Sequence, residues 1–345
     1  MRESFGRAFA GSYRYLDTAT IGVPPVDAAV QLRAVVDRWE SGGWNPADFV
    51  EPAERANAAY AELVGAGVRG VTQGSSVSAL VGLLAASAPD GTRVLVPAGE
   101  YSSLTYPFLA HGHREVTVTE VPVTDLAAQA AAYDVVAVSA VQSADGAVAD
   151  LDELRLATQD ADTQVIIDVT QAAGWANLHL DWADAVVGAA YKWLLGWRGL
   201  AWMWSPDHVH GTLVPALANW SAGANRWASN YGAEMVLADD ARRLDSSPPW
   251  FAQLAAAQTM PWLASLDREA VAGHCVRLAN RVRDAAGLAS SESPIVMLPS
   301  LELGPRLRDQ GYRVAVRQGG VRLSFHLYNT DEDVDGVINV LRGSH

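Results

Sequence analysis

Short runs of apolar, often β-branched residues recur along the first two thirds of the chain, and many segments between them have apolar positions at helical spacing. The helical spacing is clear at Val77–Ala86 and Asp152–Gln159. The strand-like runs are Val68–Thr72, Arg93–Val96, Glu115–Thr119, Val135–Val138, Gln164–Ile167, Ala185–Val187 and Leu200–Trp204. This alternation predicts an α/β fold with a seven-stranded, mostly parallel sheet. Ligands on such sheets bind at the carboxyl ends of the strands, so the polar residues after these runs are the candidates for chemistry.

The chain is long enough for two domains, since 345 residues at about 150 per domain indicate two lobes. Half of the residues are apolar and 19% are charged, which excludes a disordered or coiled-coil chain. We expect a large domain at residues 20–240. A smaller α/β domain would consist of residues 1–19 and 241–341, with a helix near Arg268–Ala285 and a strand around Val321–Phe325.

Charge and cysteine content restrict the partners and the compartment. Acidic residues outnumber basic ones by 39 to 25, giving a net charge of −14, so a nucleic acid is not expected as a partner. The single cysteine, Cys275, cannot form an internal disulfide or a cysteine-based zinc cluster, and no apolar signal segment follows Met1. The expected compartment is the cytoplasm. Residues 342–345 are typical of an expression-tag remnant.

Neither a membrane span nor a metal site is expected. The most apolar stretch, Ala185–Trp204, contains Lys192 and Arg198, and each would cost about 2.5–3.5 kcal/mol at the centre of a bilayer. The histidine pairs His111/His113 and His208/His210 have i,i+2 spacing without a third ligand nearby, which is a weak pattern for metal binding.

Lysine usage is the most informative feature of the composition. Of the 25 basic residues, 24 are arginine and one, Lys192, is lysine. Arginine serves for surface pairing and phosphate binding, but it stays protonated and cannot attack a carbonyl group. Lysine can lose its proton on burial and form a Schiff base. Since the neighbours in Ala189–Gly196 are mostly apolar, the sequence predicts a buried, reactive amine.

Asp168 follows directly on the apolar residues Val165–Ile167, 24 positions before the lysine. A carboxylate at the end of a buried strand needs a partner or a task. Beside a Schiff-base lysine, the pyridinium nitrogen of pyridoxal phosphate is such a partner, because an aspartate keeps it protonated. Taken alone, Asp168 could instead cap the following helix.

Two loops offer further groups for a cofactor. Thr72–Ser78 joins a strand to a helix, and its backbone N–H groups and serine hydroxyls suit a phosphate. Glu100–Ser103 places Tyr101 where a ring could stack on a cofactor. Gly65–Gly70 matches the pattern GxGxxG, but it lies between a helical run and a strand, the reverse of a dinucleotide site. We interpret it as a helix C-cap and turn.

Together these motifs resemble the class V aminotransferase family of pyridoxal-phosphate-dependent enzymes, fold type I, which includes cysteine desulfurases, selenocysteine lyases, kynureninases and C–S lyases. The likeness extends from Tyr15–Pro24 to Val321–Thr330. It implies pyridoxal 5′-phosphate as the cofactor and a homodimer with shared active sites. By this resemblance Lys192 carries the cofactor, Asp168 pairs with its ring nitrogen and Arg322 binds the substrate α-carboxylate. The other implied cofactor contacts are Tyr101 on the ring, Gln171 and Gln142 near the ring oxygen, and Ser75, Ser76 and Tyr191 at the phosphate.

The sequence departs from the family pattern at two positions beside the lysine. Ala189 stands where many relatives have a phosphate-binding serine. Tyr191 is similar to the tyrosine of kynureninases, whereas desulfurases usually have histidine there.

The reaction we favour is C–S β-elimination from a cysteine S-conjugate, through an external aldimine and without a persulfide on the enzyme. Val271, Cys275 and Leu278 recur at helical spacing, so Cys275 is expected to be a buried residue of an amphipathic helix. The alternatives are an aminotransferase, an epimerase or a kynureninase-like hydrolase and, in a different class, a non-catalytic dimeric scaffold. The aromatic segment Trp220–Tyr231 would form either a substrate pocket or a loop covered by dimerisation.

Overall fold

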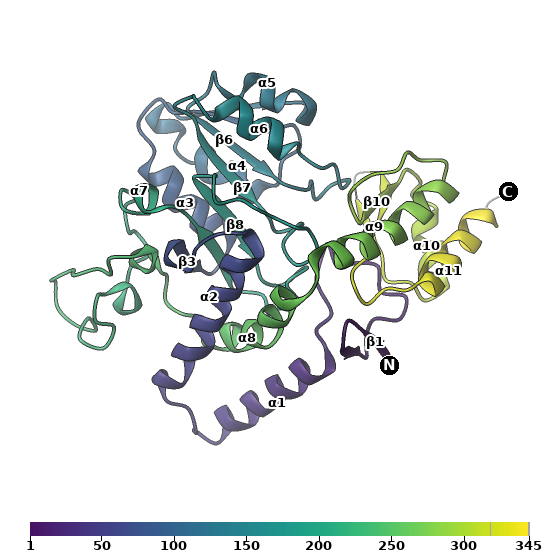
Figure 1. Cartoon of the computed structure of the whole chain (residues 1–345), viewed down its shortest axis with the longest axis horizontal. Coiled ribbons are helices and arrows are strands. Elements are labelled where there is room, and N and C mark those ends of the chain that lie inside the picture. Colours follow the sequence, from purple (N-terminus) through teal and green to yellow (C-terminus); the bar gives the residue numbers. More distant parts are fainter. Residues whose placement is uncertain (318, 344–345) are drawn as a thin grey trace.

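The computed structural model describes residues 1–317 and 319–343. A seven-stranded sheet lies at the centre of the larger lobe, and a three-stranded sheet lies in the smaller lobe that contains the C-terminal helix (Figure 1). The large sheet has the order β3 (Val71–Gly74), β9 (Ala201–Trp204), β8 (Ala185–Ala189), β7 (Gln164–Asp168), β6 (Val135–Ser139), β4 (Arg93–Pro97), β5 (Thr117–Val121). The small sheet has the order β10 (Ile295–Leu298), β12 (Gly320–Ser324), β11 (Ala315–Arg317), and β1 (Arg2–Ser4) pairs with β2 (Arg7–Phe9).

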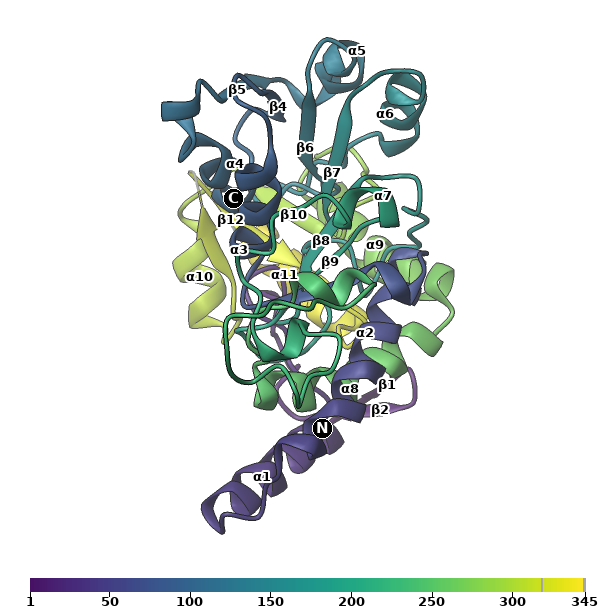
Figure 2. The same ribbon diagram turned by 90° about the vertical axis from the view of Figure 1, so that its left-hand side faces the viewer.

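Helices connect most of these strands. They are α1 (Val26–Glu40), α2 (Val50–Val64), α3 (Val77–Ser87), α4 (Ser102–Leu109), α5 (Leu126–Ala130), α6 (Leu151–Thr158), α7 (Asp207–His210), α8 (Trp250–Ser265), α9 (Arg268–Ala285), α10 (Leu303–Asp309) and α11 (Asp331–Arg342). Helix α1 projects from the body of the molecule (Figure 2).

Strand direction brings the candidate site together. Only β9 runs against its neighbours β3 and β8, while β5, β4, β6, β7 and β8 are parallel. The carboxyl ends of these parallel strands therefore meet at one edge of the sheet.

Both faces of the large sheet are buried, as is usual where crossover helices cover it on both sides. On β7, Val165 and Ile167 belong to one core and Ile166 to the other, because successive side chains point to opposite faces. Helices α3 and α4 contribute to the core of Ile166, and α2, α5 and α6 contribute to the opposite core. This double burial explains why the central strands are continuous apolar runs.

The small lobe has a core of its own between its sheet and helices α9, α10 and α11. The N-terminal segment joins it, since Leu16 N donates to Arg313 O (2.9 Å) and Ser324 N donates to Leu16 O (2.9 Å). Ala256 and Met260 of α8 pack instead in the core of the large sheet. The domain limits at residues 20 and 240 stay a prediction.

All seven strand-like runs correspond to strands of the large sheet, and Arg268–Ala285 is helix α9. The start of the first strand was wrong: Val68–Gly70 form a 3₁₀ turn, and β3 begins at Val71. The turn follows Gly65, whose positive φ of 72° ends α2, as expected for a helix C-cap. Of the segment 342–345, Arg342 ends α11, while residues 344 and 345 lie outside the described part.

Candidate active site

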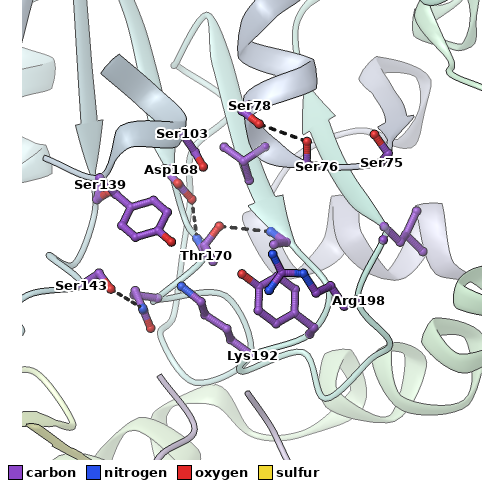
Figure 3. Close-up of a pocket in the computed structure, with 17 residues that line it drawn as sticks. Ser75, Ser76, Ser78, Ser103, Ser139, Ser143, Asp168, Thr170, Lys192 and Arg198 are labelled. Carbon is purple, nitrogen blue, oxygen red and sulfur yellow. Dashed lines mark hydrogen bonds between the residues drawn. The ribbon is translucent and has the colours of Figure 1, made fainter. Parts of the chain in front are cut away.

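A cavity of about 200 Å³ opens where β3, β4, β6, β7 and β8 end (Figure 3). Most of the residues singled out from the sequence line it: Ser75, Ser76, Tyr101, Asp168, Gln171, Tyr191 and Lys192. Gln142 and Arg322 do not. In the described ranges 1–317 and 319–343, no helix is both long and apolar enough to cross a bilayer.

Lys192 lies just after β8 and is 6% exposed. Its Nζ is 5.3 Å from the ring centroid of Tyr101 and 5.8 Å from that of Tyr191, and within the described chain it has no hydrogen-bond partner. Burial lowers the pKa of Lys192 to about 8, although the charge of Asp168 opposes this shift. The amine is therefore partly neutral near physiological pH.

The backbone around Lys192 is fixed by the N-terminal segment. Gly22 N donates to Tyr191 O (2.8 Å), and a Cβ at Gly22 would lie 2.0 Å from Lys192 O. Only glycine fits this approach. The sequence similarity noted at Tyr15–Pro24 therefore has a structural reason, since this segment supports the lysine.

Asp168 ends β7 and is 4% exposed. Its Oδ1 accepts a hydrogen bond from Thr170 N (2.7 Å), and Oδ2 has no partner in the part of the chain that the structure describes. Burial raises the pKa of Asp168 to about 6, while the Thr170 hydrogen bond and the charge of Lys192 lower it. A buried carboxylate with a free oxygen facing a cavity suits a ligand that carries an N–H donor.

The N-terminus of α3 forms the other end of the cavity. Ser76 caps this helix, because its Oγ accepts from Ala79 N (3.2 Å), and it lies 3.2 Å from Ser78 Oγ. Ser75 and Val77 also line the cavity. Hydroxyls and amide groups at a helix N-terminus are suited to a phosphate.

Gln171 and Gln142 make different contacts. Gln171 lines the cavity, where its Oε1 accepts from Trp193 Nε1 (2.7 Å) and its Nε2 donates to Ser143 Oγ (3.0 Å). Gln142 is turned away, and its Nε2 donates to Glu100 Oε2 (2.9 Å). The side chain that reaches the cavity from this loop is Ser143.

Arg322 lies on β12 of the small sheet and is 3% exposed. Its Nη1 donates to Ser143 Oγ (3.1 Å) and its Nη2 to Thr20 Oγ1 (2.8 Å), while Nε is buried without a partner. Burial lowers the pKa of Arg322 to about 10. Because Ser143 lines the cavity, its hydrogen bond to Arg322 places the guanidinium beside the cavity. The Nε–H group of Arg322 is left as a donor for a carboxylate.

Several cavity residues were not singled out from the sequence, and Thr170, Ser143 and Arg198 are among them. Thr170 connects the ends of β7 and β8, since its N donates to Asp168 Oδ1 (2.7 Å) and its Oγ1 accepts from Ala189 N (3.1 Å). The feature of the sequence that could have identified Arg198 is its position in the segment that follows Lys192. The aromatic segment Trp220–Tyr231 does not line the cavity.

The groups in this cavity fit pyridoxal phosphate. A buried lysine amine can bind its aldehyde, a buried carboxylate can accept from its protonated ring nitrogen, and a helix N-terminus can hold its phosphate.

This fold and donor set define a pyridoxal-phosphate enzyme of fold type I. The family model of the class V aminotransferases matches residues 51–299, and the chain belongs to that family. The expected cofactor, pyridoxal 5′-phosphate, and the expected fold class are thereby confirmed. No curated protein sequence matches this chain significantly.

Solved structures share the fold at low sequence identity. The cystine C–S lyase C-DES, in complex with its reaction product cysteine persulfide, has a TM-score of 0.83 and 17% identity, covering 95% of this chain and 97% of that one. The apo cysteine desulfurase of Thermococcus onnurineus NA1 has a TM-score of 0.82 and 16% identity, with 95% and 94% covered. The cysteine desulfurase CsdA of Escherichia coli has a TM-score of 0.80 and 17% identity, with 96% and 94% covered. A variant of C-DES is described with glycine covalently linked to the pyridoxal-phosphate cofactor.

Proposed function

We propose that this protein is a carbon–sulfur β-lyase that cleaves a cysteine S-conjugate and releases the sulfur together with its own substituent. The observation that carries the proposal is the separation of the basic lysine from any thiol. Lys192 faces the cavity, whereas Cys275, the one cysteine of the chain, is fully buried on α9 and does not line it. Burial also raises the pKa of the Cys275 thiol, so it is a poor acceptor for sulfur.

Lys192 acts as the base in this proposal. Its lowered pKa, about 8, leaves a useful fraction of free amine near neutral pH, and Nζ removes the proton from the substrate Cα. The electron pair of that C–H bond forms the Cα–Cβ double bond while the Cβ–S bond breaks. The sulfur leaves with the bonding pair and takes a proton from the Lys192 ammonium. Hydrolysis of the remaining fragment then gives pyruvate and ammonia, so the products are one thiol, one pyruvate and one ammonia.

Pyridoxal phosphate, when bound, supplies the electron sink that lowers the barrier to removing the Cα proton. Asp168 accepts a hydrogen bond from the ring nitrogen through its free Oδ2 and so keeps that nitrogen protonated. Tyr101 would cover the ring and Gln171 would lie near the ring oxygen, whereas Gln142 would need to turn from Glu100 to reach that oxygen. Ser75, Ser76 and Tyr191 hold the phosphate.

Arg322 binds the substrate α-carboxylate in this proposal. Two of its nitrogens already hold Ser143 and Thr20, and the unpaired Nε is one remaining donor. A carboxylate at this point would also interact with this buried cation, whose single counter-charge among the described residues is Asp17 at 3.9 Å.

A kynureninase-like hydrolase is the second candidate, because Tyr191 lines the cavity beside the lysine. Both candidates, together with an aminotransferase or epimerase, are tested by incubating the holoprotein with cysteine S-conjugates, cysteine, kynurenine and alanine, and identifying the products by mass. We expect equal amounts of thiol, pyruvate and ammonia from a conjugate. Anthranilate from kynurenine, a racemised amino acid, or alanine from cysteine with a persulfide on the protein would contradict the proposal.

We also propose a homodimer in the cytoplasm. Apolar side chains of α1 and of the loop after α7 are exposed: Val30, Val36, Trp39, Trp227, Tyr231, Met235 and Val236. Helix α1 projects away from the body (Figure 2), so a second copy of the chain could cover it. Analytical ultracentrifugation at micromolar concentration would find a dimer, and a monomeric species with full activity would contradict this assembly.

A further inference from the structure

We infer that Arg198 is the cation that binds the cofactor phosphate, in place of the hydroxyl that Ala189 cannot offer. This inference rests on the proposed assignment of the cofactor within the cavity and adds one residue to it. Ala189 lines the cavity and is buried, but its methyl group makes no hydrogen bond. This position therefore offers no side-chain hydrogen bond to a phosphate.

The geometry of Arg198 suits this task. Its side chain points into the cavity (Figure 3), and its Cζ lies 5.1 Å from the ring centroid of Tyr191. The guanidinium has no hydrogen bond or ion pair in residues 1–317 and 319–343. An arginine placed over an aromatic ring can still use the donors along its edge, and these donors can bind a phosphate through two parallel hydrogen bonds.

The loop that presents Arg198 is closed and constrained. Ala190 N donates to Leu200 O (3.0 Å) and Gly196 N donates to Ala190 O (2.9 Å), so the ends of the loop are held together. Leu195 has a φ of 56° and Gly199 a φ of 101°. A left-handed conformation is costly for leucine, and such conformations cluster at ligand-binding sites.

The charge balance of the cavity points the same way. Its lining contains one carboxylate, Asp168, and two cations, Lys192 and Arg198. A phosphate monoester carries about −1.5 to −2 charges at neutral pH, whereas a helix N-terminus supplies only about half a positive charge. Lys192 is assigned to the aldehyde group and Asp168 to the ring nitrogen. Arg198 is then the cation left for the phosphate.

Binding of two vitamers to the apoprotein separates this role from catalysis. Pyridoxine 5′-phosphate and pyridoxine lack the aldehyde, so neither bonds covalently to Lys192, and they differ only in the phosphate. We expect Arg198→Gln to weaken binding of pyridoxine 5′-phosphate about 10- to 100-fold and to leave pyridoxine binding unchanged. Adding Ala189→Ser to this variant should restore part of the loss.

Arg317→Gln is the matched control. The charge of Arg317 also lowers the pKa of Lys192, but its side chain is exposed and does not line the cavity. This variant should bind pyridoxine 5′-phosphate like the wild type.

The phosphorus resonance of bound pyridoxine 5′-phosphate gives a second measurement. Its phosphate pKa should be higher in Arg198→Gln than in the wild type, because a neighbouring cation stabilises the dianion.

The outcomes distinguish the assignment of the cofactor from the role of Arg198. If the wild type binds neither vitamer and no pyridoxal phosphate, the cofactor assignment itself fails. If the wild type binds pyridoxine 5′-phosphate tightly and Arg198→Gln binds it equally well, only the role of Arg198 is overturned. An increase in KM for the amino-acid substrate with unchanged vitamer affinity would make Arg198 a substrate-binding residue instead.

Discussion

Two buried carboxylates, Asp168 and Asp245, lie in different surroundings within the large lobe. Both are almost fully buried, and burial raises the pKa of Asp168 to about 6 and that of Asp245 to about 8. Asp168 faces the cavity with Lys192 among its charged neighbours. Asp245 follows the 3₁₀ turn Ala241–Leu244 and does not line that cavity.

The partners of Asp245 are amides in the protein core. Its Oδ1 accepts from Gln73 N (2.9 Å) and its Oδ2 from Gln73 Nε2 (3.2 Å), while Gln253 Nε2 donates to Gln73 Oε1 (2.5 Å). This cluster ties the loop before α8 to β3, the strand that leads to Ser75 and Ser76. The role of Asp245 is therefore structural, through the strand that precedes the candidate phosphate site.

The comparison shows that a raised pKa does not by itself identify a catalytic group. Both carboxylates are shifted for the same reason, the loss of solvation. Asp168 differs from Asp245 in two features: one of its oxygens is free and faces a cavity, and a cation faces the same cavity. A carboxylate with these two features can bind a ligand, while one whose oxygens are both occupied by amides can only hold the fold.

Lys192→Ala has the largest expected effect on turnover. It removes the cation that distinguishes the surroundings of Asp168 from those of Asp245. Loss of the base should lower turnover by at least about 1,000-fold. Borohydride reduction of the wild-type holoprotein should fix the cofactor to the peptide that contains Lys192, since this is the one lysine of the chain. Lys192→Arg is the control that keeps the charge but cannot lose its proton, and it should be equally inactive. Full activity in either variant would contradict the role of Lys192.

Asp168→Asn should lower kcat about 100- to 1,000-fold, because the cavity would lose the anion that stabilises a protonated ring nitrogen. Asp245→Asn is the matched control, since it makes the same chemical change at the other buried carboxylate. Its kcat should stay within a factor of about three of the wild-type value. Steady-state kinetics on the two variants side by side decides the comparison. Similar losses in both would show that the cavity does not set Asp168 apart.

The raised pKa of Asp245 should appear in the pH dependence of the stability of the apoprotein. With a folded-state pKa of about 8, Asp245 keeps its proton between about pH 4 and 8 when folded, while the unfolded chain has lost it. The folded state then binds more protons, so this group's contribution to stability falls as pH rises, by up to about 1.4 kcal/mol per pH unit. Asp245→Asn removes this contribution.

Urea unfolding of the apoproteins between pH 6.5 and 8 tests this, because Asp168 has lost most of its proton above pH 6. The wild type should lose stability with rising pH relative to Asp245→Asn. Parallel stability curves for the two proteins would contradict a raised pKa at Asp245.

The sequence was sufficient to predict the elements that carry Asp168 and Lys192. Asp168 ends an apolar run, so strand order determines its position, whereas Lys192 was found as the one lysine of the chain within an apolar stretch. The contacts of Gln142 depend instead on the buried Glu100, which also accepts from Ser139 N (2.8 Å) and so gathers donors from its surroundings. Periodicity contains no signal for such a pairing.

Arg198 could not be assigned from the sequence for a related reason. Its direction depends on the left-handed residues Leu195 and Gly199, and a leucine gives no sequence signal for that conformation. The contact between Arg322 and Ser143 joins the small sheet to a loop of the large lobe, and such a contact over 179 positions requires the three-dimensional structure.

Cys275 is a third buried ionisable group, and its substitution has the smallest expected effect on activity. Like Asp245 it does not line the cavity, and its side chain packs in an apolar core with Val271. Cys275→Ser should retain most of the lyase activity, because no sulfur is transferred to this residue. Its stability should fall by about 1–3 kcal/mol, since a serine hydroxyl would be buried among apolar groups.

Kinetics with a cysteine S-conjugate, urea unfolding and intact-protein mass after turnover test this prediction together. Cys275→Ala is the control, because it also lacks the thiol but introduces no hydroxyl. It should match the serine variant in activity and lose stability through a small cavity instead. Since both variants lack the nucleophile, equal and nearly normal turnover separates the buried role of Cys275 from a catalytic one. Turnover abolished in both folded variants, or an added sulfur atom on wild-type Cys275, would instead make the protein a persulfide-forming desulfurase.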